Sequence, residues 1–123
     1  MEWPEYERMY RVEDSNWWFV GRRQLSRVFI ERQFVPHSGA RILDIGCGTG
    51  ANLAFLAEWG EGSGIDFSPL ALSLARCRQA RAIFLDDATH WIQHEEAATV
   101  NDLLRCFLDG GLAALPVREY APR

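Results

Sequence analysis

A glycine-rich turn directly after a short apolar run is the feature that most restricts the fold of this chain. The run RILDI occupies residues 41–45, and glycines follow at positions 46, 48 and 50. A strand that leads into a helix in an α/β unit is typically joined to it by such a turn. Asp44 is unexpected directly before this turn. Backbone N–H groups and a helix N-terminus attract anionic ligands such as phosphate, whereas a carboxylate repels them.

Short strands and helices alternate along the rest of the chain. We expect strands at 41–45, 63–66, 82–85 and 112–115, and helices at 52–59, 69–78 and 95–108. Apolar periodicity indicates the helices, and Ser68 followed by Pro69 is a typical helix start. The alternation predicts an α/β fold, a Rossmann-like three-layer sandwich with a mostly parallel sheet. Asp44 and Asp66 then end neighbouring strands at the edge where such sheets bind ligands.

The first 38 residues differ in character from the remainder. We expect an amphipathic helix from Val20 to Phe34, closed by Pro36 and Gly39. The chain is therefore divided into an aromatic-rich helical segment, 1–38, and an α/β domain, 39–123. Trp17 and Trp18 either line a substrate pocket or cover the core, and we prefer the core because most aromatic side chains are buried there.

Composition excludes several classes of partner. The 123 residues suffice for one domain, and 13 basic against 17 acidic residues leave no basic surface for nucleic acid. Three cysteines without a C-x-x-C pair indicate neither a disulfide framework nor a zinc ribbon, which favours the cytoplasm. The charged start of the chain does not fit a signal peptide, and no apolar run is as long as a membrane span. We expect no membrane partner.

The spacing of Gly46, Gly48 and Ala51 also satisfies the dinucleotide fingerprint, with Asp66 about 20 residues on, where a ribose-binding acid is expected. A NAD(P)-binding oxidoreductase is therefore one alternative. Asp44 argues against it, because a carboxylate near a pyrophosphate in a partly dry site costs far more than in water. A positively charged ligand without phosphate removes that objection.

The segment LDIGCGTG, residues 43–50, resembles the first motif of class I S-adenosylmethionine-dependent methyltransferases. GIDFSP at 64–69 is similar to the family's second-strand motif, and LDGGL at 108–112 is similar to its late helix–glycine–strand passage. WWFVGRR at 17–23 resembles a lead-in segment of many small-molecule members. The resemblance implies S-adenosylmethionine as the cofactor and a small molecule as the methyl acceptor.

The resemblance also implies roles for particular residues. The glycine turn would wrap the methionine part of the cofactor, Asp44 would favour its ammonium directly or through water, and Asp66 would accept the two ribose hydroxyls. An alternative role for Asp66 is to cap the helix that follows it. The residues expected at the cofactor are Asp44, Gly46, Cys47, Gly48, Gly50, Asp66, Phe67 and Asp87.

The chain departs from the family after residue 78. Only one strand fits before the late helix, where the family carries two, so we expect a sheet shortened from the usual seven strands and an incomplete domain. Either Asp87 is the acid beside the adenine, which we prefer, or residues 85–96 correspond to the next strand and loop, with His90 near the substrate. An open edge beside 82–85 or 112–115 would invite self-association.

No catalytic residue is identifiable. Cys47 has no histidine nearby in the sequence to act as a base, so the simpler interpretation is a small residue that fills the turn. His90 and His94 lack a third ligand at metal spacing, and we expect no metal. The leading function is methyl transfer from S-adenosylmethionine to a small molecule. The alternatives are a non-catalytic or truncated relative that keeps the cofactor-binding half, and the oxidoreductase.

Overall fold

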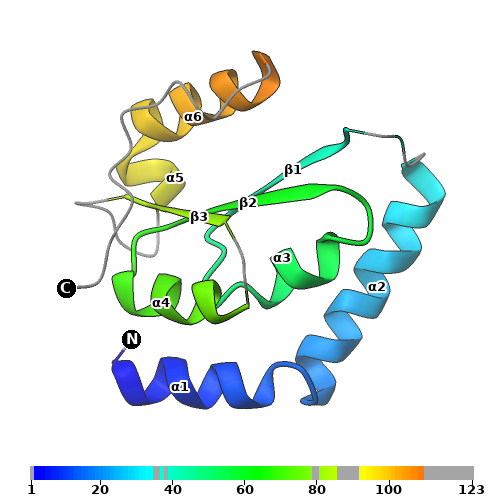
Figure 1. Cartoon of the computed structure of the whole chain (residues 1–123), viewed down its shortest axis with the longest axis vertical. Helices are drawn as coiled ribbons and strands as arrows, with labels where there is room; N and C mark the ends of the chain where they lie inside the picture. The colour runs from blue at the N-terminus through cyan, green and yellow to red at the C-terminus, as the bar shows by residue number, and fades with distance from the viewer. Residues whose placement is uncertain (1, 35–36, 38, 79–80, 86–91, 110–123) are drawn as a thin grey trace.

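The computed structural model describes residues 2–34, 37, 39–78, 81–85 and 92–109. Strands and helices alternate from residue 41 onward, as the sequence predicts (Figure 1). In chain order the elements are α1 (Trp3–Val12), α2 (Trp17–Gln33), β1 (Arg41–Ile45), α3 (Ala51–Leu56), β2 (Glu61–Asp66), α4 (Pro69–Cys77), β3 (Arg81–Phe84), α5 (Ile92–Glu95) and α6 (Ala97–Asp109).

The three strands of the described sheet are parallel and lie in the order β1, β2, β3. Asp44 of β1 is opposite Gly64 of β2, and Ile45 is opposite Ile65, so the two strands end at the same edge. Asp66 is the last residue of β2. Asp44 and Asp66 therefore lie at the carboxyl ends of neighbouring strands, which confirms the sequence-based expectation.

Helices cover both faces of this sheet, as Figure 1 shows. On one face, Val100 and Leu103 of α6 pack with Ile65 and Ile83 of the sheet. On the other face, α3 and α4 lie against the strands, and one buried cluster there consists of Cys47, Leu53 and Leu72. The α/β class with a three-layer arrangement is therefore confirmed, and the parallel sheet is short.

Several element ends differ from those expected. α3 ends at Leu56 rather than Trp59, because the chain tightens there: the Trp59 N–H donates to the carbonyl of Leu56, only three residues back. β2 begins at Glu61 rather than Ser63, β3 covers 81–84 rather than 82–85, and the helix expected at 95–108 is divided into α5 and α6. The strand expected at 112–115 lies outside the described residues.

Helix α1 is not predicted by the sequence analysis. Its start combines Pro4 in the first turn with the Glu5 side chain, which accepts the N–H of Glu2 at 2.9 Å. Tyr6 is buried against Ala71 and Leu74 of α4. The N-terminal segment thus contains two helices, and α1 lies along α4 (Figure 1).

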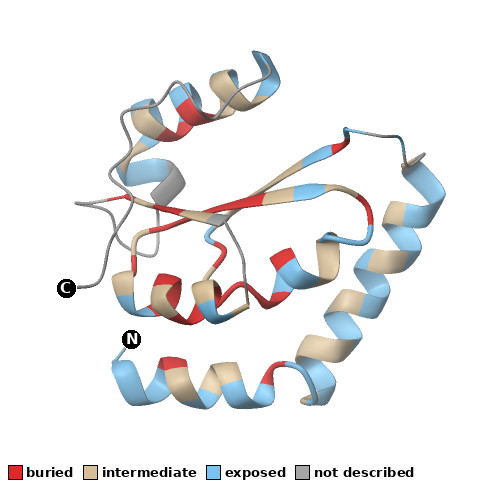
Figure 2. Ribbon diagram, in the orientation of Figure 1, coloured by how far each residue is buried: buried red, intermediate tan, exposed pale blue. Residues whose placement is uncertain are grey.

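Helix α2 begins three residues earlier than expected, because Asn16 caps it by accepting the N–H of Trp18 at 3.0 Å. None of its residues is buried (Figure 2). Trp17 is 78% exposed and Trp18 is 55% exposed, so our preferred placement of both in the core is wrong.

No helix in the described part of the chain has the length and apolar character needed to cross a membrane.

Much of the apolar surface of α2 faces solvent instead of the core. Its exposed large apolar residues are Trp17, Trp18, Leu25, Val28 and Phe29. With 3.6 residues per turn, these positions fall within an arc of about 120° on one side of the helix. The half-buried apolar residues Phe19, Val20 and Ile30 lie on the opposite side of the helix, so the amphipathic character expected from the sequence is weak.

Candidate functional site

The glycine turn is built from backbone conformations that side chains rarely adopt. Gly46, Gly48 and Gly50 have φ angles of 82°, 53° and 81°. Glycine is favoured in this left-handed region because it has no Cβ. The N–H groups of Gly46 and Cys47 donate to the carbonyl of Ile65 at 2.7 and 3.0 Å, which ties the turn to the end of β2. The structure therefore confirms the glycine-rich turn that the sequence predicts after the first strand.

Gly64 lets the turn approach β2 closely. A Cβ added there would lie 2.5 Å from the Sγ of Cys47 and 2.7 Å from a methyl of Leu53. Cys47 is 6% exposed, and burial raises the pKa of its thiol, with smaller contributions from the charges of Asp66 and Asp44. Cys47 therefore fills the turn as a small apolar residue, as the simpler interpretation predicts.

Asp66 organises the two chain segments that meet at this edge. Its Oδ2 accepts the N–H of Gly48 at 2.8 Å, and its Oδ1 accepts the N–H of Ser68 at 2.8 Å. Ser68 in turn caps α4, because its hydroxyl accepts the N–H of Ala71 at 3.2 Å. The Asp66 side chain is thus committed to the backbone and is only 5% exposed. An ionised carboxylate has about four acceptor sites, so these two bonds leave Asp66 with further acceptor capacity.

Asp44 differs from Asp66 in the hydrogen bonding of its carboxylate. Its Oδ2 is buried and has no hydrogen-bond partner among the described residues. Burial raises the pKa of Asp44, and the negative charge of Asp66 raises it further. A buried carboxylate without a partner is costly, and a cation beside it would relieve that cost.

The other residues expected at the site are placed as follows. Gly46, Cys47 and Gly48 line a cavity of about 210 Å³ beside the turn. Phe67 instead packs, half-buried, against the core cluster that includes Ile65. Asp87 and His90 lie outside the described residues, so the two registers proposed for residues 82–96 stay predictions. Among the residues that the structure describes, no group of histidine, cysteine, aspartate and glutamate could hold a metal ion.

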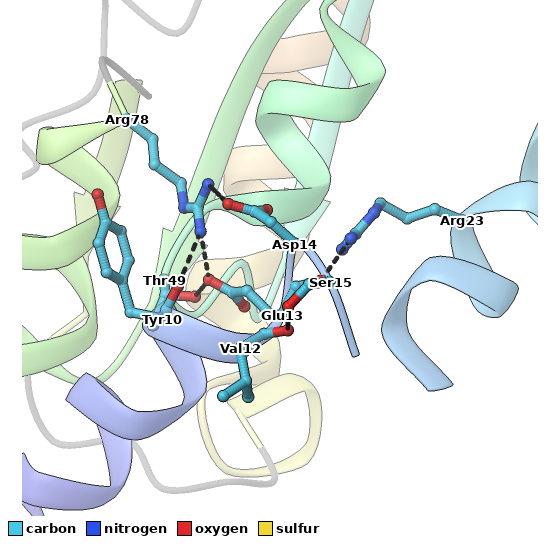
Figure 3. Close-up of polar contacts among 8 residues, drawn as sticks. All are labelled: Tyr10, Val12, Glu13, Asp14, Ser15, Arg23, Thr49 and Arg78. Carbon is cyan, nitrogen blue, oxygen red and sulfur yellow. Dashed lines mark hydrogen bonds and ion pairs between the residues drawn. The ribbon is translucent and has the colours of Figure 1, made fainter. Parts of the chain in front are cut away.

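A buried polar network that the sequence analysis missed holds the N-terminal segment against the glycine turn (Figure 3). Glu13, 4% exposed, accepts the Thr49 hydroxyl at 2.5 Å and the Arg78 guanidinium at 2.9 Å through the same oxygen. Arg78 also donates to Asp14 at 2.9 Å and stacks on the ring of Tyr10. Burial by itself would lower the pKa of Arg78, but the bonds and charges of Asp14 and Glu13 raise it.

The same network shapes the cavity beside the turn. Its walls come from α1, the corner after it, α2 and the start of α3, and its lining outside the turn includes Met9, Glu13, Phe19, Arg22, Arg23 and Asn52. Arg23 donates to the backbone carbonyl of Glu13, which holds α2 at the corner (Figure 3). The N-terminal segment therefore forms one wall of the candidate site.

The arrangement defines an α/β domain with a glycine turn and two acids at adjacent strand ends. Residues 42–109 match the family model described as a methyltransferase domain, and the chain belongs to this family. Comparison with curated proteins finds no match.

Solved structures of methyltransferases are similar to parts of the chain. CalS10 from Micromonospora echinaspora, an amino pentose methyltransferase solved with SAM bound, is 31% identical over 66% of this chain and 34% of that protein, with a TM-score of 0.47. A TehB-like SAM-dependent methyltransferase from Corynebacterium glutamicum is 31% identical over 48% and 33%, with a TM-score of 0.40. A SAM-dependent methyltransferase from Thiobacillus denitrificans, in complex with S-adenosyl-L-homocysteine, is 25% identical over 68% and 42%, with a TM-score of 0.44.

The matched region covers 33% to 42% of each of these three proteins, so the chain corresponds to well under half of their length. Because the TM-scores are low, the family assignment rests on the match to residues 42–109.

Proposed function

We propose that this chain binds S-adenosylmethionine at the glycine turn and transfers its methyl group to a small molecule. The observation that carries the proposal is the buried Oδ2 of Asp44 at the end of β1, which has no partner among the residues that the structure describes. A ligand with an ammonium and a sulfonium supplies the positive charge that this oxygen lacks, whereas the pyrophosphate of NAD would add a second negative charge. Asp44 therefore favours methyl transfer over hydride transfer.

The residues at the turn fit this cofactor in two further respects. Gly46 and Gly48 line the cavity beside the turn, and a Cβ built at Gly46 would meet no other atom within 4 Å, so the backbone is open to a ligand. Cys47 and Gly50 support the conformation of the turn, and Phe67 and Asp66 lie at the next strand end. We propose that Asp44 faces the methionine ammonium and that Asp66 approaches the ribose after its bond to Gly48 rearranges.

When bound, the cofactor supplies an activated methyl group, which leaves the sulfonium in an in-line displacement. The protein contributes positioning and exclusion of water. The N-terminal segment is suited to both roles, because α1 and α2 form one wall of the cavity. A second cavity of about 430 Å³, lined mainly by apolar atoms, shares Met9 and Phe19 with it, which supports an acceptor site on this segment.

Calorimetric titration of the chain with S-adenosylmethionine, S-adenosylhomocysteine and NAD in parallel tests the proposal. Binding of the two adenosyl sulfur compounds with no binding of NAD supports it, and binding of NAD alone contradicts it. Formation of S-adenosylhomocysteine with a panel of small acceptors then distinguishes an enzyme from a relative that keeps only the cofactor-binding half.

We also propose a cytoplasmic location and self-association through an open sheet edge. The location rests on the spacing of the three cysteines, which are free thiols in the structure. Within the described sheet, β1 and β3 are the edge strands, and unpaired strand edges favour pairing with another chain. Light scattering at several concentrations checks the second point: a monomer at all of them contradicts self-association.

A further inference from the structure

Helices α1 and α2 meet at a corner (Figure 1), which holds the cavity of about 430 Å³ that we propose as the acceptor site. A cavity of this volume is typical of small-molecule sites. Its lining residues are Glu5, Arg8, Met9, Val12, Asn16 and Phe19. Met9 and Phe19 also line the cavity beside the glycine turn, so a molecule in the corner lies next to the proposed cofactor site.

One face of α1 forms most of this cavity. The residues that α1 contributes are Glu5, Arg8, Met9 and Val12. They recur three and four positions apart, so they lie side by side on the helix. Tyr6, on the adjoining face, is buried against α4. Helix α1 is therefore held by one face, and the neighbouring face, where Val12 is 37% exposed, is open to a ligand.

Arg8 is the charged group that gives this cavity its chemistry. Both acids of α1 are already engaged: Glu7 pairs with Arg11 at 3.6 Å, and Glu5 accepts the N–H of Glu2 at 2.9 Å. The charge of Glu5 also lies at the helix N-terminus, where the helix dipole favours an anion. Arg8 has no hydrogen bond or ion pair among the residues that the structure describes. The cavity therefore combines apolar surface with an uncompensated positive charge.

Asn16 adds a second donor from the start of α2. Its Oδ1 accepts the N–H of Trp18, which leaves its Nδ2 group as a donor without a partner in the described part of the chain. A guanidinium can donate two parallel hydrogen bonds to a carboxylate, and an amide N–H can donate another. Both groups border the apolar surface of Met9 and Phe19.

We propose that this cavity binds an apolar molecule that carries a carboxylate, and that Arg8 binds the carboxylate. The inference rests on the proposed function, because only methyl transfer makes the occupant of a cavity next to the cofactor an acceptor. It adds the class of acceptor, an apolar organic acid, and the residue that selects it.

Three probes with one ring system and different charges test the assignment: indoleacetate, its neutral amide and the cation tryptamine. Backbone amide chemical shifts of Met9, Val12 and Phe19 during titration report both the affinity and the place of binding. The comparison uses the wild-type chain and Arg8→Gln. Arg11→Gln is the matched control, because Arg11 is an exposed arginine of the same helix that lines neither cavity.

We expect the wild type to bind indoleacetate about three- to tenfold more tightly than the amide, a modest factor because Arg8 is exposed, and tryptamine most weakly. Arg8→Gln should remove this preference and leave binding of the amide unchanged, and Arg11→Gln should behave like the wild type. Glu5→Gln keeps an acceptor for the helix start but removes a negative charge, so it should strengthen binding of indoleacetate.

Several results overturn the assignment. Tightest binding of tryptamine would make the cavity a cation site, and equal losses of indoleacetate and amide in Arg8→Gln would show a merely structural role of Arg8. Circular dichroism establishes that each variant is folded. Titration of the same samples with S-adenosylmethionine separates the two proposals. A chain that binds S-adenosylmethionine but not indoleacetate at millimolar concentration contradicts the acceptor class alone, and the reverse result contradicts the proposed function alone.

Discussion

Glu13 and Asp44 are two carboxylates that flank the same glycine turn in opposite surroundings. Glu13 is paired with Thr49 and Arg78, whereas one buried oxygen of Asp44 has no hydrogen-bond partner in the part of the chain that the structure describes. We call α1 with the corner residues 13–16 the closed side of the turn, and α2 with the cavity at Asp44 the open side. The closed side pairs its carboxylates within the protein, whereas the open side carries the unpaired carboxylate oxygen that we propose faces a ligand.

The helices of the two sides differ in the same way. On the closed side, α1 buries Tyr6 against α4. On the open side, α2 buries no residue and is attached through arginines: Arg23 bonds to Glu13, and Arg27 makes two hydrogen bonds of 2.7 Å to Glu58. Buried packing is therefore concentrated on one side of the turn, and the groups that we propose to bind the cofactor lie on the other.

The largest effect on stability is expected on the closed side, from Glu13→Ala. Removing this carboxylate leaves the Arg78 guanidinium with the exposed Asp14 as its one remaining ion pair among the described residues, besides its contacts with Tyr10, and leaves the Thr49 hydroxyl without its Glu13 partner. We therefore expect a loss of about 3 kcal/mol in the free energy of unfolding. Urea denaturation measures it. Glu7→Ala, which breaks an exposed pair with Arg11, is the control and should cost less than about 1 kcal/mol. Equal losses for the two variants would remove the distinction between the sides.

A pair of aromatic truncations compares the two helices directly. Tyr6 of α1 is 6% exposed and Phe29 of α2 is 59% exposed. Tyr6→Ala should lower the free energy of unfolding by about 2 to 3 kcal/mol, and Phe29→Ala should change it by less than about 0.5 kcal/mol. Thermal melts at two protein concentrations provide the measurement. A large, concentration-dependent loss for Phe29→Ala would mean that another chain covers α2 in solution.

Asp44→Asn should separate stability from binding on the open side. Because the substitution removes the negative charge, it should weaken binding of S-adenosylmethionine by about tenfold. This factor corresponds to the free energy of one charge-assisted hydrogen bond. The same change should make the ligand-free protein more stable at neutral pH, because the folded state raises the pKa of Asp44 above 3.8. Calorimetry and thermal melts measure the two effects.

The pH dependence of that stability difference has a definite sign. A carboxyl whose pKa is raised by folding binds protons more tightly when folded, so its contribution to stability decreases as the pH rises from about 3.8 through the raised value. The advantage of Asp44→Asn over the wild type should therefore be absent below that range and grow toward neutral pH. A variant that is less stable than the wild type at pH 7 would show that Asp44 has an internal partner.

A small effect is expected for Arg27→Gln, which removes the exposed link between α2 and Glu58. Its guanidinium also lies 5.0 Å from the ring centroid of Trp59, so both an ion pair and a ring contact are lost. We expect only a small decrease in the free energy of unfolding, well below that of Glu13→Ala, and a still smaller decrease at high salt. A loss as large as that of Glu13→Ala would show that α2 is held as firmly as α1.

The sequence predicts the parts of the site whose signals are local. Asp44, Gly46 and Gly48 were found because an apolar run followed by glycines specifies a strand and a turn within ten residues, and Ser68-Pro69 marks the start of α4 equally well. Helix α1 also carried local signals, in Pro4, Glu5 and the helical spacing of Tyr6 and Tyr10, and could have been predicted.

The remainder depends on contacts that sequence patterns do not contain. The partners of Glu13 are Thr49 and Arg78, 36 and 65 positions away, and nothing near Glu13 distinguishes it from an exposed acid. In α2, apolar residues lie on both sides of the helix, so periodicity does not show which side faces the protein. Likewise, the second-strand motif marks Asp66 as a site residue without showing that backbone N–H groups of Gly48 and Ser68 already occupy its oxygens.

Mapping of backbone amide chemical shifts during titration with S-adenosylhomocysteine tests the central claim most directly. We predict saturable shifts that are largest for Gly46 to Gly50 and for Phe67 and Ser68, at the carboxyl edge of β1 and β2. Ala40 and Gly60, at the opposite edge of these strands, should not shift. Saturable shifts centred on that opposite edge, or no shifts at all at millimolar ligand, would contradict a cofactor site at the glycine turn.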